Sequence, residues 1–165
     1  MIEHGDDLRF HYGGSKYRHG WSINTDFSIR TDIDPADERD SIHVMMAKIK
    51  RDRFASLAST YREGFDVDAD HRMGEELFVN VLARNGQVRV ALAAKTDPYH
   101  CSLRKHEHLP GLSFDDCLPI TGDHIRAPVQ FKNARLTDIS PDKPLTLRFE
   151  LTRAEIFTYE WSDVP

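Results

Sequence analysis

Apolar and polar residues alternate along most of this 165-residue chain with a period near two. Successive side chains of a β-strand point to opposite faces of a sheet, so this period predicts strands with one buried face. Roughly nine to eleven such segments, separated by turn residues, indicate an all-β fold, either a sandwich or a barrel. Residues 145–151 show the pattern most clearly. The apolar residues that share one face of this segment are Leu145, Leu147, Phe149 and Leu151.

Two of these segments, residues 76–84 and 87–93, flank the dipeptide Asn85-Gly86. Both residues tolerate the positive φ of a type I′ turn, and Asn-Gly between two β-prone runs is the strongest short-range hairpin signal. We therefore expect two separate strands here, joined by a tight hairpin.

Two further breaks in the alternation are informative. Residues 152–155 separate two β-prone runs and are expected to form either a tight turn or a bulge that changes which face is apolar. Residues 47–57 contain good helix formers, but their β-branched and aromatic neighbours favour two strands broken near residues 51–53. A single helical turn is suggested in residues 35–40.

Composition bounds the class of protein and its partners. Hydrophobic residues make up 39% of the chain and charged residues 30%, so one core in a single domain over residues 1–165 is expected. The 27 acidic side chains outnumber the 22 basic ones, which disfavours nucleic acid as a partner. No apolar run approaches the roughly 20 residues of a membrane helix, and the N-terminus lacks the features of a signal peptide. A soluble chain, cytoplasmic by default, is therefore expected.

Neither the cysteines nor the histidines form a recognised metal motif. Cys101 and Cys117 are not in a paired C-x-x-C spacing, so both are expected to be reduced thiols. His106 and His108 flank Glu107, and on a strand both imidazoles would project from the same face, a geometry that can chelate a metal. Basic neighbours argue against a cation there, and no cofactor is expected.

Asp66, Asp68 and Asp70 alternate in a segment that is expected to be a polar loop. An EF-hand loop beginning at Asp66 would need glycine at its sixth position and a bidentate acid at its twelfth, where this chain has His71 and Leu77. The segment is therefore interpreted as a solvated acidic loop, with an irregular calcium site as the weaker alternative.

One glycine-punctuated run, residues 12–21, gathers aromatic rings, cations and an imidazole. Aromatic rings stack on the apolar face of a sugar while polar side chains bond its hydroxyl groups. The alternative is that these rings pack onto a neighbouring sheet. The candidate carbohydrate-binding residues are Tyr12, Tyr17, His19, Trp21 and, from a later acidic loop, Asp115.

A catalytic centre within this chain is the weaker interpretation. A glycosidase needs two carboxyl groups roughly 5 to 9 Å apart, one protonated and one ionised. Asp115 and Asp116 are adjacent and would point to opposite faces of a strand, and no G-x-S-x-G nucleophile motif is present. If the chain is an enzyme, Asp116 or Asp123, the latter in an expected turn, is the candidate acid. His19 or His124 would then be an auxiliary.

Seven strand and turn segments in the C-terminal half of the chain occur in an order that has a known parallel. They are residues 74–81, 86–90, 109–117, 120–123, 128–131, 144–151 and 154–159, which read GEELFVNV, GQVRV, LPGLSFDDC, ITGD, PVQF, PLTLRFEL and AEIFTY. This order resembles the β-sandwich domain at the C-terminus of five-bladed-propeller glycoside hydrolases of the family 32 and 43 type. Upstream, residues 8–14 and 19–20 are similar to the last propeller strands of those proteins, and residues 47–56 to the crossing into the sandwich.

The resemblance implies a concanavalin-like or jelly-roll sandwich of two antiparallel sheets, with residues 1–30 as a remnant of a propeller blade. In such enzymes the catalytic carboxylates lie at the propeller centre, which this chain almost entirely lacks. The expected function is therefore a non-catalytic module that binds carbohydrate or supports a hydrolase. The alternatives are a glycoside hydrolase that acts alone or with a partner chain, and a purely structural domain. Secretion is common among such relatives, and exposed sheet edges suggest a homo-oligomer.

Overall fold

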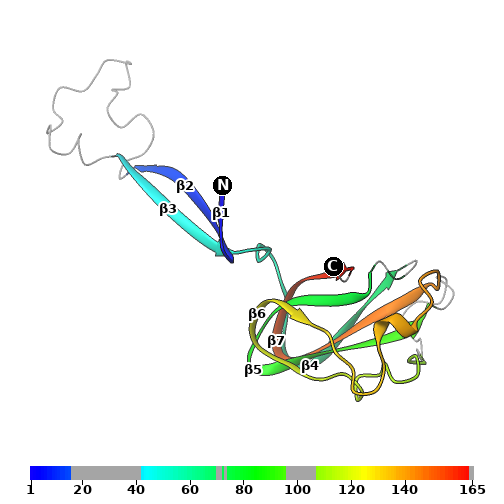
Figure 1. The fold of residues 1–165 in the computed structure, drawn as a ribbon. Helices are drawn as coiled ribbons and strands as arrows, with labels where there is room; N and C mark the ends of the chain where they lie inside the picture. The colour runs from blue at the N-terminus through cyan, green and yellow to red at the C-terminus, as the bar shows by residue number, and fades with distance from the viewer. Residues whose placement is uncertain (16–41, 70–71, 73, 96–106, 164–165) are drawn as a thin grey trace, which may run out of the picture. The chain divides into compact units, whose positions relative to one another are not determined.

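The computed structural model describes residues 1–15, 42–69, 72, 74–95 and 107–163. Contacts divide the chain into two compact units, Met1–Arg51 and Asp52–Pro165, and each unit has its own antiparallel sheet (Figure 1). Within the described residues, no helix has the length and hydropathy needed to cross a membrane. The helical turn expected in residues 35–40 lies outside the described residues.

The first unit is a three-stranded antiparallel sheet in the order β1-β2-β3. Its strands are β1 (Ile2–His4), β2 (Asp7–Ser15) and β3 (Ile42–Lys50). Gly5, with φ of 59°, makes the tight turn between β1 and β2, a backbone conformation that glycine adopts without steric cost. Among the described residues of this unit only Leu8 is fully buried.

The second unit is a four-stranded antiparallel sheet in the order β4-β7-β5-β6. Its elements are β4 (Leu57–Ala69), β5 (Glu76–Ala94), β6 (Ile120–Pro128), the 3-10 helix η1 (Leu136–Asp138) and β7 (Leu145–Ser162). The two longest strands, β5 and β7, lie side by side at the centre of the sheet and pair along most of their length. The predicted break near residues 51–53 is confirmed, because Asp52 has φ of 60° and separates β3 from β4.

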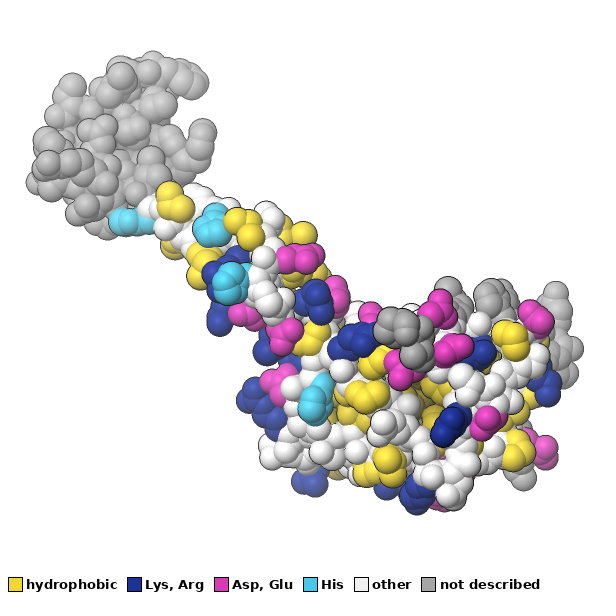
Figure 2. All heavy atoms as spheres, in the orientation of Figure 1, with side chains coloured by type: hydrophobic (Ala, Val, Ile, Leu, Met, Phe, Trp, Pro, Cys, Tyr) yellow, Lys and Arg dark blue, Asp and Glu magenta, His cyan; other side chains and the backbone are white. Residues whose placement is uncertain are grey.

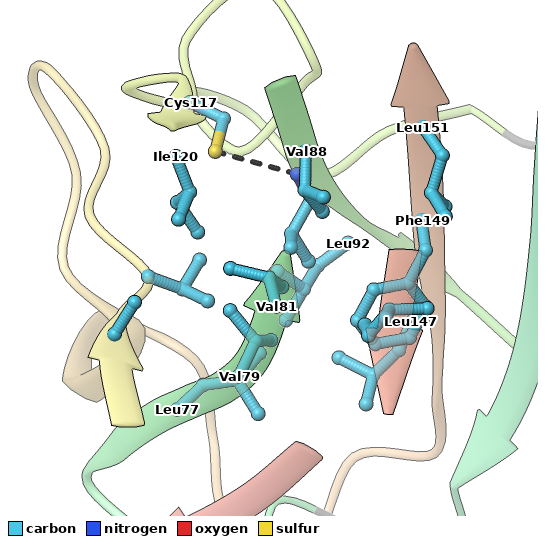
Figure 3. Close-up of a cluster of buried hydrophobic side chains, with 14 of the residues drawn as sticks. Leu77, Val79, Val81, Val88, Leu92, Cys117, Ile120, Leu147, Phe149 and Leu151 are labelled. Carbon is cyan, nitrogen blue, oxygen red and sulfur yellow. Dashed lines mark hydrogen bonds between the residues drawn. The ribbon is translucent and has the colours of Figure 1, made fainter. Parts of the chain in front are cut away.

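The core of the second unit comes from alternate residues of its long strands. Figure 3 shows side chains of β5 and β7 pointing toward one another and toward Cys117 and Ile120. The Cys117 thiol accepts a hydrogen bond from the Val90 N–H at 3.3 Å, and burial raises its pKa. Cys117 is therefore a reduced, buried thiol, as predicted, while Cys101 lies outside the described residues. The core residues of β5 and β7 are Leu77, Val79, Val81, Ala83, Val88, Val90, Leu92, Leu145, Leu147, Phe149, Leu151, Ala154 and Ile156.

The predicted hairpin at Asn85-Gly86 is wrong, because β5 continues through this dipeptide as one strand. Leu82 pairs with Glu155 and Gln87 with Thr152, so the chain bulges between these positions instead of turning back. A Cβ atom at Gly86 would overlap the carbonyl oxygens of Thr152 and Arg153. The glycine permits close approach of the β7 backbone, a role that a local turn signal does not reveal.

The bulge changes which residues of each strand face the core. On β5 the residues of the core cluster are odd-numbered up to Ala83 and even-numbered from Val88. On β7 they are odd-numbered up to Leu151 and even-numbered from Ala154, and Arg153 has φ of 46°. Of the two alternatives for residues 152–155, the bulge is confirmed. Continuous strands replace two of the expected strand pairs, which is why seven strands are described instead of the larger number predicted.

The all-β class is confirmed. The two antiparallel sheets, of three and four strands, are not closed into a barrel, and this arrangement is consistent with the predicted two-sheet β-sandwich. The assignment of residues 1–30 to a propeller-blade remnant stays a prediction.

Candidate functional site

The face of the β4-β7 pair opposite the core is charged. Arg148 and Glu150 alternate with the buried row of β7, and their register partners on β4 are Asp66 and Gly64. Arg148 Nε donates to Asp66 Oδ1 at 3.0 Å, and a second arginine, Arg62, lies 2.7 Å from Glu150 Oε2. Arg148 therefore pairs with an acid on the neighbouring strand β4.

These side chains line a groove of about 530 Å³, here called the polar groove. Gly64 is one of its lining residues, and a Cβ atom there would come within 2.7 Å of the Phe149 carbonyl oxygen. Glycine therefore lets β4 and β7 approach closely and also leaves the groove unfilled at this point. The lining residues are Arg62, Glu63, Gly64, Phe65, Asp66, Phe114, Arg148, Phe149 and Glu150.

The segment that precedes β6 contributes an aromatic side to the polar groove. The Arg148 guanidinium lies 5.7 Å from the Phe114 ring centroid, and Arg89 Nη1 donates to the Phe114 carbonyl oxygen at 3.1 Å. His108 packs edge-on against the same ring, and its Nε2 is 3.0 Å from Arg148 Nη1. Because a guanidinium only donates, His108 Nε2 accepts this bond, and the imidazole is neutral when the bond is made.

The polar groove offers hydrogen-bond donors and acceptors beside an aromatic ring. Its two arginines face three carboxylates, a formal net charge of −1, so it does not present a cationic track. On the face shown in Figure 2, basic and acidic side chains are likewise interspersed over the described surface of the Asp52–Pro165 unit. This chemistry suits a neutral ligand with many hydroxyl groups better than a polyanion.

The predicted carbohydrate-binding residues are only partly described. Tyr17, His19 and Trp21 lie outside the described residues. Tyr12 lies on β2 with 48% of its surface exposed, and Asp115 has a fully exposed side chain 3.9 Å from Arg89. Tyr12 and Asp115 belong to different units, whereas Asp115 directly follows the groove residue Phe114.

Asp116, the first candidate acid, closes a turn. Its Oδ2 accepts hydrogen bonds from the Ser113 hydroxyl at 2.6 Å and from the Ser113 N–H at 3.1 Å. The Ser113 hydroxyl bond, followed by the backbone bond, lowers the pKa of Asp116. A carboxyl group with a lowered pKa is ionised at neutral pH, which does not suit a general acid.

Asp123, the second candidate, lies on β6 and not in the expected turn. Its two carboxylate oxygens are each 2.7 Å from an arginine, Arg84 or Arg53. The hydrogen bond from Arg84, then that from Arg53, lowers the pKa of Asp123. His124, the candidate auxiliary, donates from Nε2 to the Thr121 carbonyl oxygen at 2.8 Å. Both residues thus have structural partners within the sheet.

No group of three or more potential metal ligands occurs among the described side chains. His106 lies outside them, and His108 bonds Arg148. The expected acidic loop is in part a strand, because Asp66 and Asp68 lie on β4 and Asp68 accepts from the Thr146 hydroxyl at 2.7 Å. The calcium and histidine-metal alternatives stay predictions.

Most residues of the polar groove were not anticipated. The alternation of Arg148 and Glu150 with buried residues indicated a polar face, but their partners Arg62 and Asp66 are 88 and 82 positions away. Phe114 gave no signal, because a phenylalanine in a loop is equally typical of a core residue.

Comparison of the chain with protein-family models, with curated proteins and with solved structures found no match. The resemblance to the sandwich domain of glycoside hydrolases therefore stays a prediction that rests on the strand and turn motifs.

Proposed function

We propose that this protein is a non-catalytic carbohydrate-binding protein and that the polar groove of its second unit holds the sugar. The observation that carries the proposal is the groove itself. It is about 530 Å³ in volume, places paired arginines and carboxylates on the sheet, and has an aromatic ring at its side. This volume lies in the range of sites that bind small organic ligands.

The pairing of charges in the groove fits the chemistry of sugar hydroxyl groups. Each hydroxyl both donates and accepts a hydrogen bond, so a site with neighbouring arginines and carboxylates can satisfy both functions at once. Arg62 with Glu150, and Arg148 with Asp66, are two such pairs. The Phe114 ring supplies an apolar surface for the C–H groups of a pyranose.

The state of the carboxylates supports a binding role over a hydrolytic one. Glu150 and Asp66 are each bonded to an arginine within the groove. Asp116 and Asp123 have lowered pKa values. A glycosidase requires one carboxylic acid that keeps its proton near neutral pH, and neither Asp116 nor Asp123 has an environment that favours this.

Affinity electrophoresis against a panel of neutral soluble polysaccharides, including glucans, xylans and galactans, tests this proposal. At least one polysaccharide is expected to retard the full-length protein. Arg148→Met and Phe114→Ala should each weaken that retardation about tenfold or more, which corresponds to roughly 1.4 kcal/mol of binding free energy.

Arg126→Met is the matched control, since Arg126 is also paired with an acid, Glu160, and also lies over a phenylalanine ring, but is not in the groove. This variant should bind like the wild type. A Trp21→Ala variant examines the aromatic run predicted from the sequence. The groove would be rejected as a sugar site if only Trp21→Ala lost the retardation. It would also be rejected if no polysaccharide retarded the wild-type protein.

A further inference from the structure

β4 forms an edge of the four-stranded sheet. Among the described strands it pairs only with β7. Its surface is largely exposed, and Leu57 and Tyr61 have 56% and 76% of their surface in solvent. The strand is thirteen residues long and contains neither proline nor lysine, two residues that commonly block edge pairing. The register of β4 with β7 shifts between Ser59 and Arg62, so residues 62–69 are the regular part of this edge, and this part is able to accept another strand.

The opposite edge, β6, is protected. The His124 carbonyl oxygen accepts a hydrogen bond from Arg53 at 3.2 Å, and the Thr121 carbonyl oxygen accepts one from the His124 ring at 2.8 Å. The strand ends at Pro128, which has no N–H to donate, and Gly122 with φ of 99° interrupts its regular geometry. Of the two edges of this sheet, β4 is the one that is open to pairing.

The charges along β4 select a particular partner. When two copies of β4 pair antiparallel about a twofold axis at one residue, positions equally far before and after that residue lie opposite each other. Residues that lie opposite each other point to the same face of the sheet. An axis at Gly64 places Arg62 of each copy opposite Asp66 of the other. Axes at Arg62, Glu63 or Asp66 instead place like charges opposite each other, which destabilises a pair of strands. An axis at Phe65 places Arg62 opposite Asp68, which already accepts a hydrogen bond from the Thr146 hydroxyl, and leaves Asp66 opposite a glycine.

We propose that two copies of this chain associate through their β4 edges, antiparallel and centred on Gly64, to continue the sheet across the dimer. Within each copy Arg62 already contacts Glu150, and Asp66 contacts Arg148. In the dimer, Arg62 of one copy lies opposite Asp66 of the other, which joins the two ion pairs. On each side of the axis, two arginines and two carboxylates then alternate in one network. It also brings the polar grooves of the two copies together, because Gly64 lies in both.

Sedimentation velocity of the full-length protein, without added polysaccharide, tests the dimer separately from sugar binding. The wild type is expected to be dimeric at about 100 µM, a concentration appropriate to a small interface. Arg62→Asp and Asp66→Arg each place like charges across the axis, so each should raise the dimer dissociation constant at least about tenfold. The double variant restores opposite charges and should recover most of the lost affinity.

Arg126→Asp is the control, because it breaks an ion pair of the same kind beside β6 and should leave the dimer intact. Thermal unfolding of each variant checks that the sheet is retained. If a single variant folds poorly, the dimer dissociation constant of the double variant still tests the proposed pairing. A wild type that is monomeric would overturn the proposed pairing. So would dimers that persist in both single variants, or a loss of the dimer in Arg62→Asp alone. A double variant that stays monomeric would also overturn it.

Discussion

Arg53 shows how one side chain organises the start of the second unit. Only 8% of its side chain is exposed, and its guanidinium donates to Asn80 Oδ1 at 2.8 Å and to the Val81 carbonyl oxygen at 3.1 Å. It also lies 4.6 Å from the Phe157 ring centroid and 2.7 Å from Asp123. A buried arginine needs such partners, because an uncompensated charge in this position is strongly destabilising.

We predict that Asp123→Asn lowers the free energy of unfolding by about 2 kcal/mol at neutral pH, since it removes a charged partner from Arg53 and Arg84. The pKa of Asp123 is lowered in the folded state. The carboxylate therefore contributes its full stability above the unfolded pKa of about 3.9, and that contribution is lost as the pH falls through the lowered folded value.

Urea denaturation of wild type and variant from about pH 7 down to about pH 3 measures this difference, which should be largest at neutral pH and shrink under acid conditions. Asp115→Asn is the control, because that side chain is fully exposed and its replacement should leave stability nearly unchanged. A gap between wild type and Asp123→Asn that is constant with pH would contradict the assigned role.

At the scale of the element, β5 and β7 are long strands that share a bulge. Both change facing parity at the same level of the sheet, so both keep an apolar row toward the core on either side of it. The two strands change the face of their apolar residues together. If only one strand did so, the apolar residues of half of that strand would point away from the core. Gly86 and Arg153 are the residues whose backbones make this possible.

Gly86→Ala is therefore expected to destabilise the protein by about 3 kcal/mol, because the added methyl group would overlap two carbonyl oxygens of β7 and force the strands apart. Gly13→Ala is the matched control on β2, where a Cβ atom would meet nothing within 4 Å and φ is not positive. Thermal or urea unfolding compares the two. Similar stability in both variants would show that the bulge tolerates a side chain.

At the scale of the whole molecule, the described residues of the two units differ in how much apolar surface they bury. All residues of the main core cluster lie between Leu77 and Ile156, within the second unit. The first unit buries Leu8 but exposes Ile2, Val44 and Met46 by more than half. A small sheet with so little burial rarely has independent stability.

A fragment of residues 52–165 is therefore predicted to fold alone, with a cooperative unfolding transition and the circular dichroism of a β protein. A fragment of residues 1–51 should show neither. Circular dichroism and urea unfolding of the two fragments, beside the full-length protein, provide the measurement. A fragment 52–165 without a cooperative transition would show that its core depends on the first unit.

Local patterns predicted much of this architecture. The strand class, the buried face of residues 145–151, the break near residues 51–53 and the parity change at residues 152–155 all follow from which neighbouring residues are apolar. The predicted hairpin at Asn85-Gly86 is wrong because a glycine is suited to a position where two strands approach closely as well as to a turn. Turn propensity alone does not distinguish these two uses of glycine.

The sequence by itself determined that the chain forms β-strands and, for segments such as residues 145–151, which residues face a core, because side-chain alternation is a property of adjacent residues. Only the tertiary structure decided that β5 and β7 are continuous, that Arg62 meets Glu150 and Asp66 meets Arg148, and that β4 is an open edge. Those features depend on strand order and register, which bring together residues far apart in the chain. The polar groove exists because of that register.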